Sequence, residues 1–328
     1  MTDGASLILA NDEVHELAEG PFWDPVRRRL LWVDIVRGLV LVGEVMDDGT
    51  VPILDRVGFG GTVGAVAVSE AGDWVVAGTE RLLVRRPDGS VLEGPRLLPD
   101  EGGRRLNDGK PDPAGRYVVG SLRLEGDSEV EHLVVVDRDG RATELDDDLT
   151  LSNGLGWTAD GRTFYSVDTG RARIHRRAYD PATGAVGERE VFVETEGGHP
   201  DGMCLDAEDH LWVAIWGAGE VRRYSPGGEL VTTIAVPAPQ TTCVAFAGDD
   251  LGTLVITTAT ERLTDADRAA NPGWGRMYTV RPGVTGLPQP LWGGFADGVL
   301  QRQDAASAAA GPSPFGVVSA AGVEGSAS

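Results

Sequence analysis

The amino-acid sequence predicts an all-β protein, specifically a six-bladed β-propeller with four-stranded antiparallel blades. A unit consisting of an apolar strand, a turn of small residues and a second apolar strand occurs six times in the 328 residues. Successive turns lie about 45 residues apart, which is the period of a four-stranded propeller blade rather than of a helical or leucine-rich repeat. The central turns are expected near Asp24, Glu70, Asp112, Asp160, Asp206 and Gly248.

Each unit contains short apolar runs bounded by Gly, Asp or Pro, as buried strands require. The first unit reads EGPFWDPVRRRLLWVDI from Glu19 to Ile35, and helical periodicity is expected only at 264–270. Because the repeat fills residues 14 to about 295 and leaves no room for a linker, we expect one propeller domain at 1–296. A tail at 297–328, made mainly of Ala, Gly and Ser, has too few apolar side chains to offset the entropy of ordering and is expected to be disordered.

A formal net charge of −22 and a pI near 4.5 limit the partners of the chain. This charge repels phosphate backbones and anionic lipids, so we expect no nucleic acid and no membrane as a partner. No stretch approaches the roughly 18 apolar residues of a membrane span, and the start of the chain lacks the features of a signal peptide, so a cytoplasmic location is expected. Closed propellers protect their edges, which predicts a monomer or a weak homo-oligomer. Cys204 and Cys243, at equivalent places in neighbouring units, are expected to be reduced, buried thiols.

Oxygen-bearing side chains directly precede the first strand of four units, namely Glu19, Asn107, Asn153 and Asp201. The innermost strand of every blade lines the central channel of a propeller, and its first residues emerge at one mouth. These four side chains are therefore expected to ring a single opening. Carboxylate and amide oxygens are hard ligands that suit Ca²⁺, Mg²⁺ or Mn²⁺, whereas a structural zinc site would need Cys and His.

Each of these residues also has a purely structural interpretation. Asn153-Gly154 and Asp201-Gly202 are common turn dipeptides, and Asn107 begins an Asn-Asp-Gly sequence that suits a tight loop. Their recurrence at one register favours a shared site. Glu19 favours it further, because a carboxylate between apolar neighbours would otherwise be a charge beside the core without a partner.

The chain resembles the family of gluconolactonase, senescence marker protein (regucalcin) and luciferin-regenerating enzyme, which are six-bladed propellers. The resemblance covers about residues 14–295 and rests on the motifs AEGPFWD, RLNDGKPDPAGRYVVGS, LSNGLGWTADGRTFY and PDGMCLDAEDHLWVA. It implies that one divalent cation is bound by Glu19, Asn153 and Asp201.

The same resemblance implies that substrate hydroxyls are bound by Arg105, Asn107 and Glu125, the last of which is matched by an ungapped alignment from the Asn. It further implies a metal-dependent lactonase that hydrolyses a sugar lactone, such as a gluconolactone-like aldonolactone, to the aldonic acid. The cation would polarise the carbonyl oxygen, and Asp201 would act as both ligand and general base. Ca²⁺ is the favoured ion, with Mg²⁺, Mn²⁺ and Zn²⁺ as alternatives.

Other functions remain open at this point. They are hydrolysis of another ester, an organophosphate or a non-sugar lactone, and a calcium-binding regulatory role with little turnover. The motifs of serine hydrolases, phosphate-loop enzymes and zincins are absent from the sequence. His199 is a candidate second base, Trp157 or Trp216 could stack on a sugar ring, and the polar segment 123–131 could form a lid.

Overall fold

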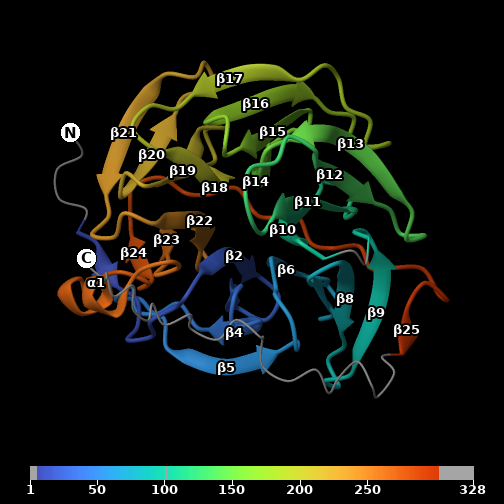
Figure 1. The fold of residues 1–328 in the computed structure, drawn as a ribbon, viewed down its shortest axis with the longest axis horizontal. Helices are drawn as coiled ribbons and strands as arrows, with labels where there is room; N and C mark the ends of the chain where they lie inside the picture. Colours follow the sequence, from blue (N-terminus) through green and yellow to red (C-terminus); the bar gives the residue numbers. More distant parts are fainter. Residues whose placement is uncertain (1–5, 100–101, 303–328) are drawn as a thin grey trace, which may run out of the picture.

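The computed structural model describes residues 6–99 and 102–302, and these residues form a closed ring of six antiparallel sheets (Figure 1). The predicted six-bladed β-propeller is confirmed. The short helix α1 (Asp265–Ala270) lies in the connection between two strands of the last blade, and Thr264 caps its N-terminus. The described part of the chain contains no helix with the length and apolar character needed to span a membrane.

In five blades the four strands follow one another in sequence from the channel outwards. Blade 1 consists of β2 (Ala18–Asp24), β3 (Arg29–Asp34), β4 (Leu39–Gly43) and β5 (Ile53–Gly58). Blade 2 consists of β6 (Ala65–Val68), β7 (Trp74–Ala77), β8 (Arg81–Arg85) and β9 (Val91–Arg96). Blade 3 consists of β10 (Arg104–Pro111), β11 (Tyr117–Arg123), β12 (Glu131–Val136) and β13 (Ala142–Leu149).

The remaining blades continue the ring. Blade 4 consists of β14 (Ser152–Trp157), β15 (Thr163–Asp168), β16 (Arg173–Ala178) and β17 (Glu190–Glu194). Blade 5 consists of β18 (His199–Leu205), β19 (Leu211–Trp216), β20 (Glu220–Tyr224) and β21 (Leu230–Ala235). Blade 6 contains β22 (Thr241–Ala247), β23 (Thr253–Thr258) and β24 (Tyr278–Val280).

The fourth strand of blade 6 comes from the other end of the chain. This strand, β1 (Ile8–Leu9), pairs with β24 through Ile8 opposite Thr279 and Leu9 opposite Tyr278. Ala10 extends the pairing, since its N–H donates to the carbonyl of Met277 at 2.8 Å. The N-terminal segment therefore closes the ring.

The first residues of the expected tail also join a sheet. The strand β25 (Gln301–Arg302) pairs with β9, with Gln301 opposite Glu93 and Arg302 opposite Leu92. The sheet of blade 2 thus extends beyond residue 296, and residues 303–328 lie outside the described residues.

Apolar side chains fill the space between neighbouring blades. The largest fully buried side chains come from the strands of several blades, and they include Phe22, Trp32, Tyr117, Phe164 and Trp212. Burial of a large apolar side chain stabilises the folded state by about 1.5–3 kcal/mol, so these side chains contribute to the stability of the ring. Cys204 and Cys243 are buried free thiols, as expected.

Candidate metal centre

The first residues of the inner strands converge at one mouth of the channel, where they line a cavity of about 480 Å³. Five of the six residues expected in the site line this cavity and are buried, with exposed fractions of 4–8%: Glu19, Arg105, Asn107, Asn153 and Asp201. They come from the inner strands of blades 1, 3, 4 and 5. The structure thus brings together side chains that are up to 182 positions apart (201 − 19) in the sequence.

Irregular strand pairing at the start of the inner strands orients these side chains toward the channel. The strand register shifts between Glu19 and Phe22 in blade 1 and between Asn153 and Leu155 in blade 4. Similar shifts follow Leu106 in blade 3 and Pro200 in blade 5. A β-bulge bends a strand and redirects a side chain, so each blade can turn one polar group into the channel without losing its sheet.

The glycines that follow two of these polar residues serve close packing rather than turns. A Cβ on Gly154 would lie 2.5 Å from the carbonyl oxygen of Asp201, and a Cβ on Gly202 would lie 2.2 Å from the sulfur of Cys243. Neither glycine has a positive φ, which the turn interpretation would require. The Asn-Gly and Asp-Gly pairs therefore mark places where inner strands approach each other closely.

A chain of hydrogen bonds orients the two amide side chains. Arg105 Nη1 donates to Asn107 Oδ1 at 2.6 Å, and Asn107 Nδ2 donates to Asn153 Oδ1 at 2.6 Å. Asn153 Nδ2 then donates to Thr169 Oγ1 at 2.8 Å, and that hydroxyl donates to the carbonyl of Pro200 at 2.8 Å. The chain begins at a guanidinium, which only donates, and ends at a carbonyl, which only accepts, so the direction of every bond in it is determined.

The carboxylates at this mouth lie in an environment that disfavours their charge. Burial, with the negative charge of Asp108 as a second cause, raises the pKa of Glu19 to about 8. Burial and then the charge of Glu19 raise the pKa of Asp201 well above its ordinary value. Burial also lowers the pKa of Arg105 to about 10, although nearby carboxylates oppose the shift. Arg105 remains a cation at neutral pH, but its single positive charge does not balance the negative charges that these carboxylates carry when ionised.

The donor set fits a divalent cation. Asp201 Oδ1 is buried without a hydrogen-bond partner among the described residues, a state that leaves a carboxylate oxygen without compensation. A cation bound by Glu19, Asn153 and Asp201 would satisfy this oxygen and offset the repulsion between the two acids. Two carboxylates and an amide carbonyl form a set of hard oxygen ligands of the kind that Ca²⁺ prefers.

A second cluster of possible ligands, Asp206, Glu208 and His210, lies at the turn of blade 5. Here the carboxylate of Asp206 already accepts four hydrogen bonds. Oδ2 accepts from Trp212 Nε1 and Arg223 Nε, each at 2.8 Å, and Oδ1 accepts from the N–H groups of Glu208 and His210 at 2.9 and 3.1 Å. A cation at this turn would compete with these bonds, so the cluster is a structural element.

Of two further residues considered from the sequence, His199 lines the cavity and Glu125 does not. Glu125 is exposed and does not line the cavity, whereas Asp127 of the same segment does, together with Arg123 and Leu124. The segment 123–131 therefore borders the mouth. His199 lines the cavity and donates through Nδ1 to the carbonyl of Thr169 at 2.9 Å.

The two tryptophans considered as stacking platforms lie at opposite ends of the channel. Trp216 lines the candidate metal cavity, but Trp157 lines the cavity at the other end. The sequence interpretation also missed Thr169, which connects the amide chain to blade 5 and lies outside the recognisable motifs. Asp108 was missed as well, although it directly follows Asn107 and lies in the same bulge.

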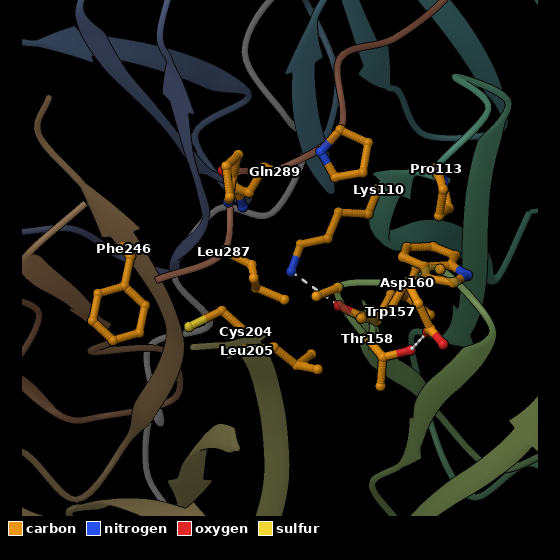
Figure 2. Close-up of a pocket in the computed structure, with 16 residues that line it drawn as sticks. Lys110, Pro113, Trp157, Thr158, Asp160, Cys204, Leu205, Phe246, Leu287 and Gln289 are labelled. Atoms are coloured by element: carbon orange, nitrogen blue, oxygen red, sulfur yellow. Dashed lines mark hydrogen bonds between the residues drawn. The ribbon is translucent and has the colours of Figure 1, made fainter. Parts of the chain in front are cut away.

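The cavity at the other end measures about 440 Å³, and Figure 2 shows its lining. Its walls are mainly apolar and include Trp157, Leu205 and Phe246. The buried ammonium of Lys110 donates to the carbonyls of Leu155 at 3.0 Å and Met203 at 2.7 Å. The ammonium of Lys110 is thus held by the inner strands of blades 4 and 5, whereas Trp157 Nε1 is buried without a hydrogen-bond partner among the described residues.

Comparison with known proteins shows the family to which the chain belongs. The sequence profile of the SMP-30/Gluconolactonase/LRE-like region matches residues 17–260. The chain is 32% identical to the putative sugar lactone lactonase YvrE of Bacillus subtilis over 288 residues, covering 87% of this chain and 97% of that protein. It is 32% identical to pentonolactonase XacC of Haloferax volcanii over 280 residues, covering 83% and 93% of the two chains.

A solved structure supports the same relationship. The crystal structure of the calcium-binding protein regucalcin from Agrobacterium tumefaciens superposes with a TM-score of 0.79 at 30% sequence identity, covering 87% of this chain and 96% of that one. The match therefore extends over the whole propeller rather than over single blades. The chain belongs to the SMP-30/gluconolactonase/LRE-like family.

Proposed function

We propose that this protein is a divalent-metal-dependent lactonase that hydrolyses a sugar lactone to the corresponding aldonic acid. The observation that carries the proposal is the buried pair Glu19 and Asp201, whose raised pKa values and unpartnered Asp201 oxygen create a demand for a cation at the floor of an open cavity. The family relationship and the relatives named as lactonases support the choice of reaction.

The metal would be bound by Glu19, Asn153 and Asp201, with Ca²⁺ as the favoured ion. A bound divalent cation supplies Lewis-acid stabilisation of the charge that develops on the lactone carbonyl oxygen when water attacks. The hydrogen-bond chain fixes the amide of Asn153 and so contributes a preorganised oxygen ligand.

Asp201 would act as the general base. Its carboxylate accepts a proton from the attacking water while the water oxygen forms a bond to the carbonyl carbon, and it returns the proton to the ring oxygen as the ester C–O bond breaks. Lactone and water thus give the hydroxy acid without a further reactant.

Arg105 and Asn107 would bind the hydroxyl groups of the substrate. Within the described part of the chain, both hydrogen bonds of the Arg105 side chain use Nη1, which leaves Nε and Nη2 for a ligand. This contact would orient the lactone ring toward the attacking water. Glu125 stays a proposed third contact from the resemblance, and Asp127 is the acid of that segment that lines the cavity.

The decisive experiment measures turnover after metal removal. The protein is stripped with a chelator, and proton release from glucono-δ-lactone and related lactones is followed as Ca²⁺, Mg²⁺, Mn²⁺ or Zn²⁺ is restored, with spontaneous hydrolysis subtracted. Turnover that returns with the metal and is absent from Asp201→Ala supports the proposal. Tight metal binding without turnover on any lactone would contradict it and favour a binding or regulatory role.

A further inference from the structure

Blade 1 contains a buried carboxylate that holds the segment leading into the strand of Glu19. Asp34, the last residue of β3, is 1% exposed. Its two oxygens accept hydrogen bonds from the N–H groups of Glu16 at 3.0 Å and Leu17 at 3.2 Å. Arg37 forms an ion pair with the same carboxylate at 3.3 Å and donates to the carbonyl of Val14 at 2.8 Å.

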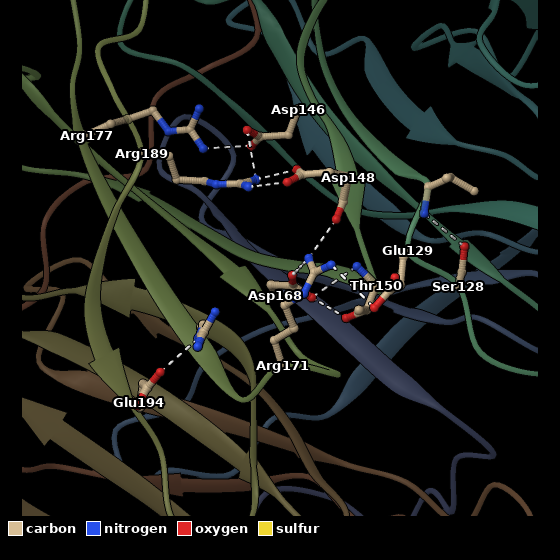
Figure 3. A network of polar contacts seen from close by, with 12 residues as sticks. Ser128, Glu129, Asp146, Asp148, Thr150, Asp168, Arg171, Arg177, Arg189 and Glu194 are labelled. Carbon is tan, nitrogen blue, oxygen red and sulfur yellow. Dashed lines mark hydrogen bonds and ion pairs between the residues drawn. The ribbon is translucent and has the colours of Figure 1, made fainter.

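Blade 4 repeats this arrangement around Asn153. Asp168, the last residue of β15, is fully buried and accepts from the N–H of Thr150 at 3.1 Å and from its hydroxyl (Figure 3). Arg171 contacts the carboxylate at 2.8 Å and donates to the carbonyl of Asp148 at 2.6 Å. Figure 3 shows Arg171 between Asp168 and Asp148.

The spacing is identical in the two blades. We call Asp34 and Asp168 the clamping aspartates. Each lies fifteen positions after the proposed metal ligand of its blade (34 − 19 and 168 − 153), and an Arg follows three positions later. The clamped N–H group lies three positions before the ligand (Glu16 and Thr150), and the carbonyl held by the Arg lies five positions before it (Val14 and Asp148). Two blades on opposite sides of the ring thus share one main-chain N–H contact and both arginine contacts at equivalent positions (Figure 1), while the second bond to the Asp comes from the N–H of Leu17 in blade 1 and from the hydroxyl of Thr150 in blade 4.

The arrangement is not a general feature of the blades. The second strands of the other four blades end at Ala77, Arg123, Trp216 and Thr258, none of which carries a carboxylate. Blade 5 supplies Asp201 without its own clamp, but its entry is held from blade 4. Thr169, directly after Asp168, donates to the carbonyl of Pro200 at 2.8 Å and accepts through its own carbonyl from His199 Nδ1 at 2.9 Å.

We infer that Asp34 and Asp168 are positioning residues of the metal centre, each fixing the main chain that delivers a ligand, Glu19 or Asn153. This inference rests on the proposed metal site. Main-chain anchoring matters here because a cation needs its ligand oxygens within a few tenths of an ångström of their places, and groups behind the ligands commonly change metal affinity 10- to 100-fold.

The opposite end of the same hairpin offers a matched control. Asp24, the last residue of β2, is also 1% exposed and accepts from the N–H groups of Val26 at 3.0 Å and Arg27 at 3.1 Å. It forms an ion pair with Arg27, three positions later, at 3.0 Å. Asp24 therefore has the burial and the bonds of Asp34 but lies at the turn, away from the mouth where the ligands converge.

The experiment compares Asp34→Asn, Asp168→Asn and Asp24→Asn in the full-length chain. Each protein is stripped with a chelator and titrated with Ca²⁺ by calorimetry, and its unfolding in urea is measured with chelator present. Asparagine keeps the shape but removes the negative charge and replaces one acceptor oxygen with an NH2 donor, so it cannot keep all the contacts of either carboxylate. We expect the dissociation constant for Ca²⁺ to rise about ten-fold or more in Asp34→Asn and Asp168→Asn, and to change less than about two-fold in Asp24→Asn, although all three lose stability.

A milder variant covers the case in which a buried Asp→Asn change prevents folding. Thr150→Val keeps the volume of the side chain but removes the hydroxyl bond to Asp168, and we expect roughly a two- to ten-fold rise in the dissociation constant. Wild-type affinity in the clamp variants, or an equal loss in Asp24→Asn, would overturn the inference alone. A wild-type protein that binds no divalent cation would overturn the proposed function and this inference with it.

Discussion

The two ends of the central channel hold cavities of similar size, about 480 and about 440 Å³, but they treat buried charge in opposite ways. At one end the ionised forms of Glu19 and Asp201 would repel each other, and an oxygen of Asp201 has no partner among the described residues. At the other end the ammonium of Lys110 donates to two carbonyls in mainly apolar surroundings. The difference teaches that buried charge left without compensation, rather than cavity size, distinguishes the end of this propeller that we propose to bind the cation.

The largest effect is expected from removing one of the two acids proposed to bind the cation. Glu19→Gln should lower kcat/KM at least about 10³-fold, because several kcal/mol of metal-dependent stabilisation of the transition state are lost. Without metal, the variant should be at least as stable as the wild type, since a repulsion between buried acids is gone. Lactone turnover and urea unfolding in chelator measure the two effects. Wild-type turnover in this variant would remove Glu19 from the metal site.

The stability of the metal-free protein should depend on pH because Glu19 is a buried acid. The pKa of Glu19 is about 8 in the folded state against an ordinary value of 4.5, so between these values the folded state holds a proton that the unfolded state has released. Stability of the metal-free protein should therefore fall as the pH rises from about 4.5 to about 8, by at most about 5 kcal/mol for this group.

Urea unfolding in chelator at pH 5 and pH 8 tests this fall, and Glu19→Gln is the control because it lacks the titrating group. The difference in stability between wild type and variant should change with pH in the predicted direction. Saturating Ca²⁺ should reverse the trend, because the cation binds the ionised form. A difference that stays constant with pH would contradict the assignment.

At the end of the channel that contains Lys110, a mutation should change the stability of the protein rather than its activity. Lys110→Met leaves the carbonyls of Leu155 and Met203 without their donor and should lower the free energy of unfolding by about 2–4 kcal/mol. We expect kcat/KM to change less than about ten-fold, since Lys110 does not line the metal cavity. A loss of turnover as large as that of Glu19→Gln, with the protein folded, would break the distinction between the two ends.

The smallest effect is expected at Cys204, a buried free thiol that lines the cavity at the Lys110 end of the channel. Cys204→Ser should keep kcat/KM within about two-fold and lower stability by about 1 kcal/mol, because a hydroxyl replaces a weakly polar group in a buried place. Steady-state kinetics beside thermal unfolding checks both values. Strong loss of activity would show that the far cavity takes part in the reaction.

The sequence alone is enough to predict the architecture and the convergence of the expected ligands. The six units have one period, and residues that precede inner strands must emerge at one mouth, so the repeat itself places Glu19, Asn153 and Asp201 together, and all three line one cavity. The clamps of Asp34 and Asp168 are equally visible as a fixed spacing of fifteen residues, but their role depends on main-chain hydrogen bonds that only the fold shows.

Features outside the repeat cannot be placed in this way. Glu125 is matched by counting from Asn107, yet the segment 123–131 is mostly a loop whose conformation no strand register constrains, and there Asp127 lines the cavity instead. Thr169 cannot be assigned a role from the spacing of the repeat, because its role arises from contact with the next blade.

The pairing of β1 with β24 has a consequence for how this molecule unfolds. An open array of repeats such as a solenoid can lose units from its free ends one at a time, because each repeat contacts only its neighbours. Here the first strand completes the last blade, so every blade has two neighbours and none is terminal. The proposed ligands come from blades 1, 4 and 5, so the proposed centre would persist only while the ring is closed. Cooperativity is thus built into the topology, and binding of a cation would stabilise all six blades together.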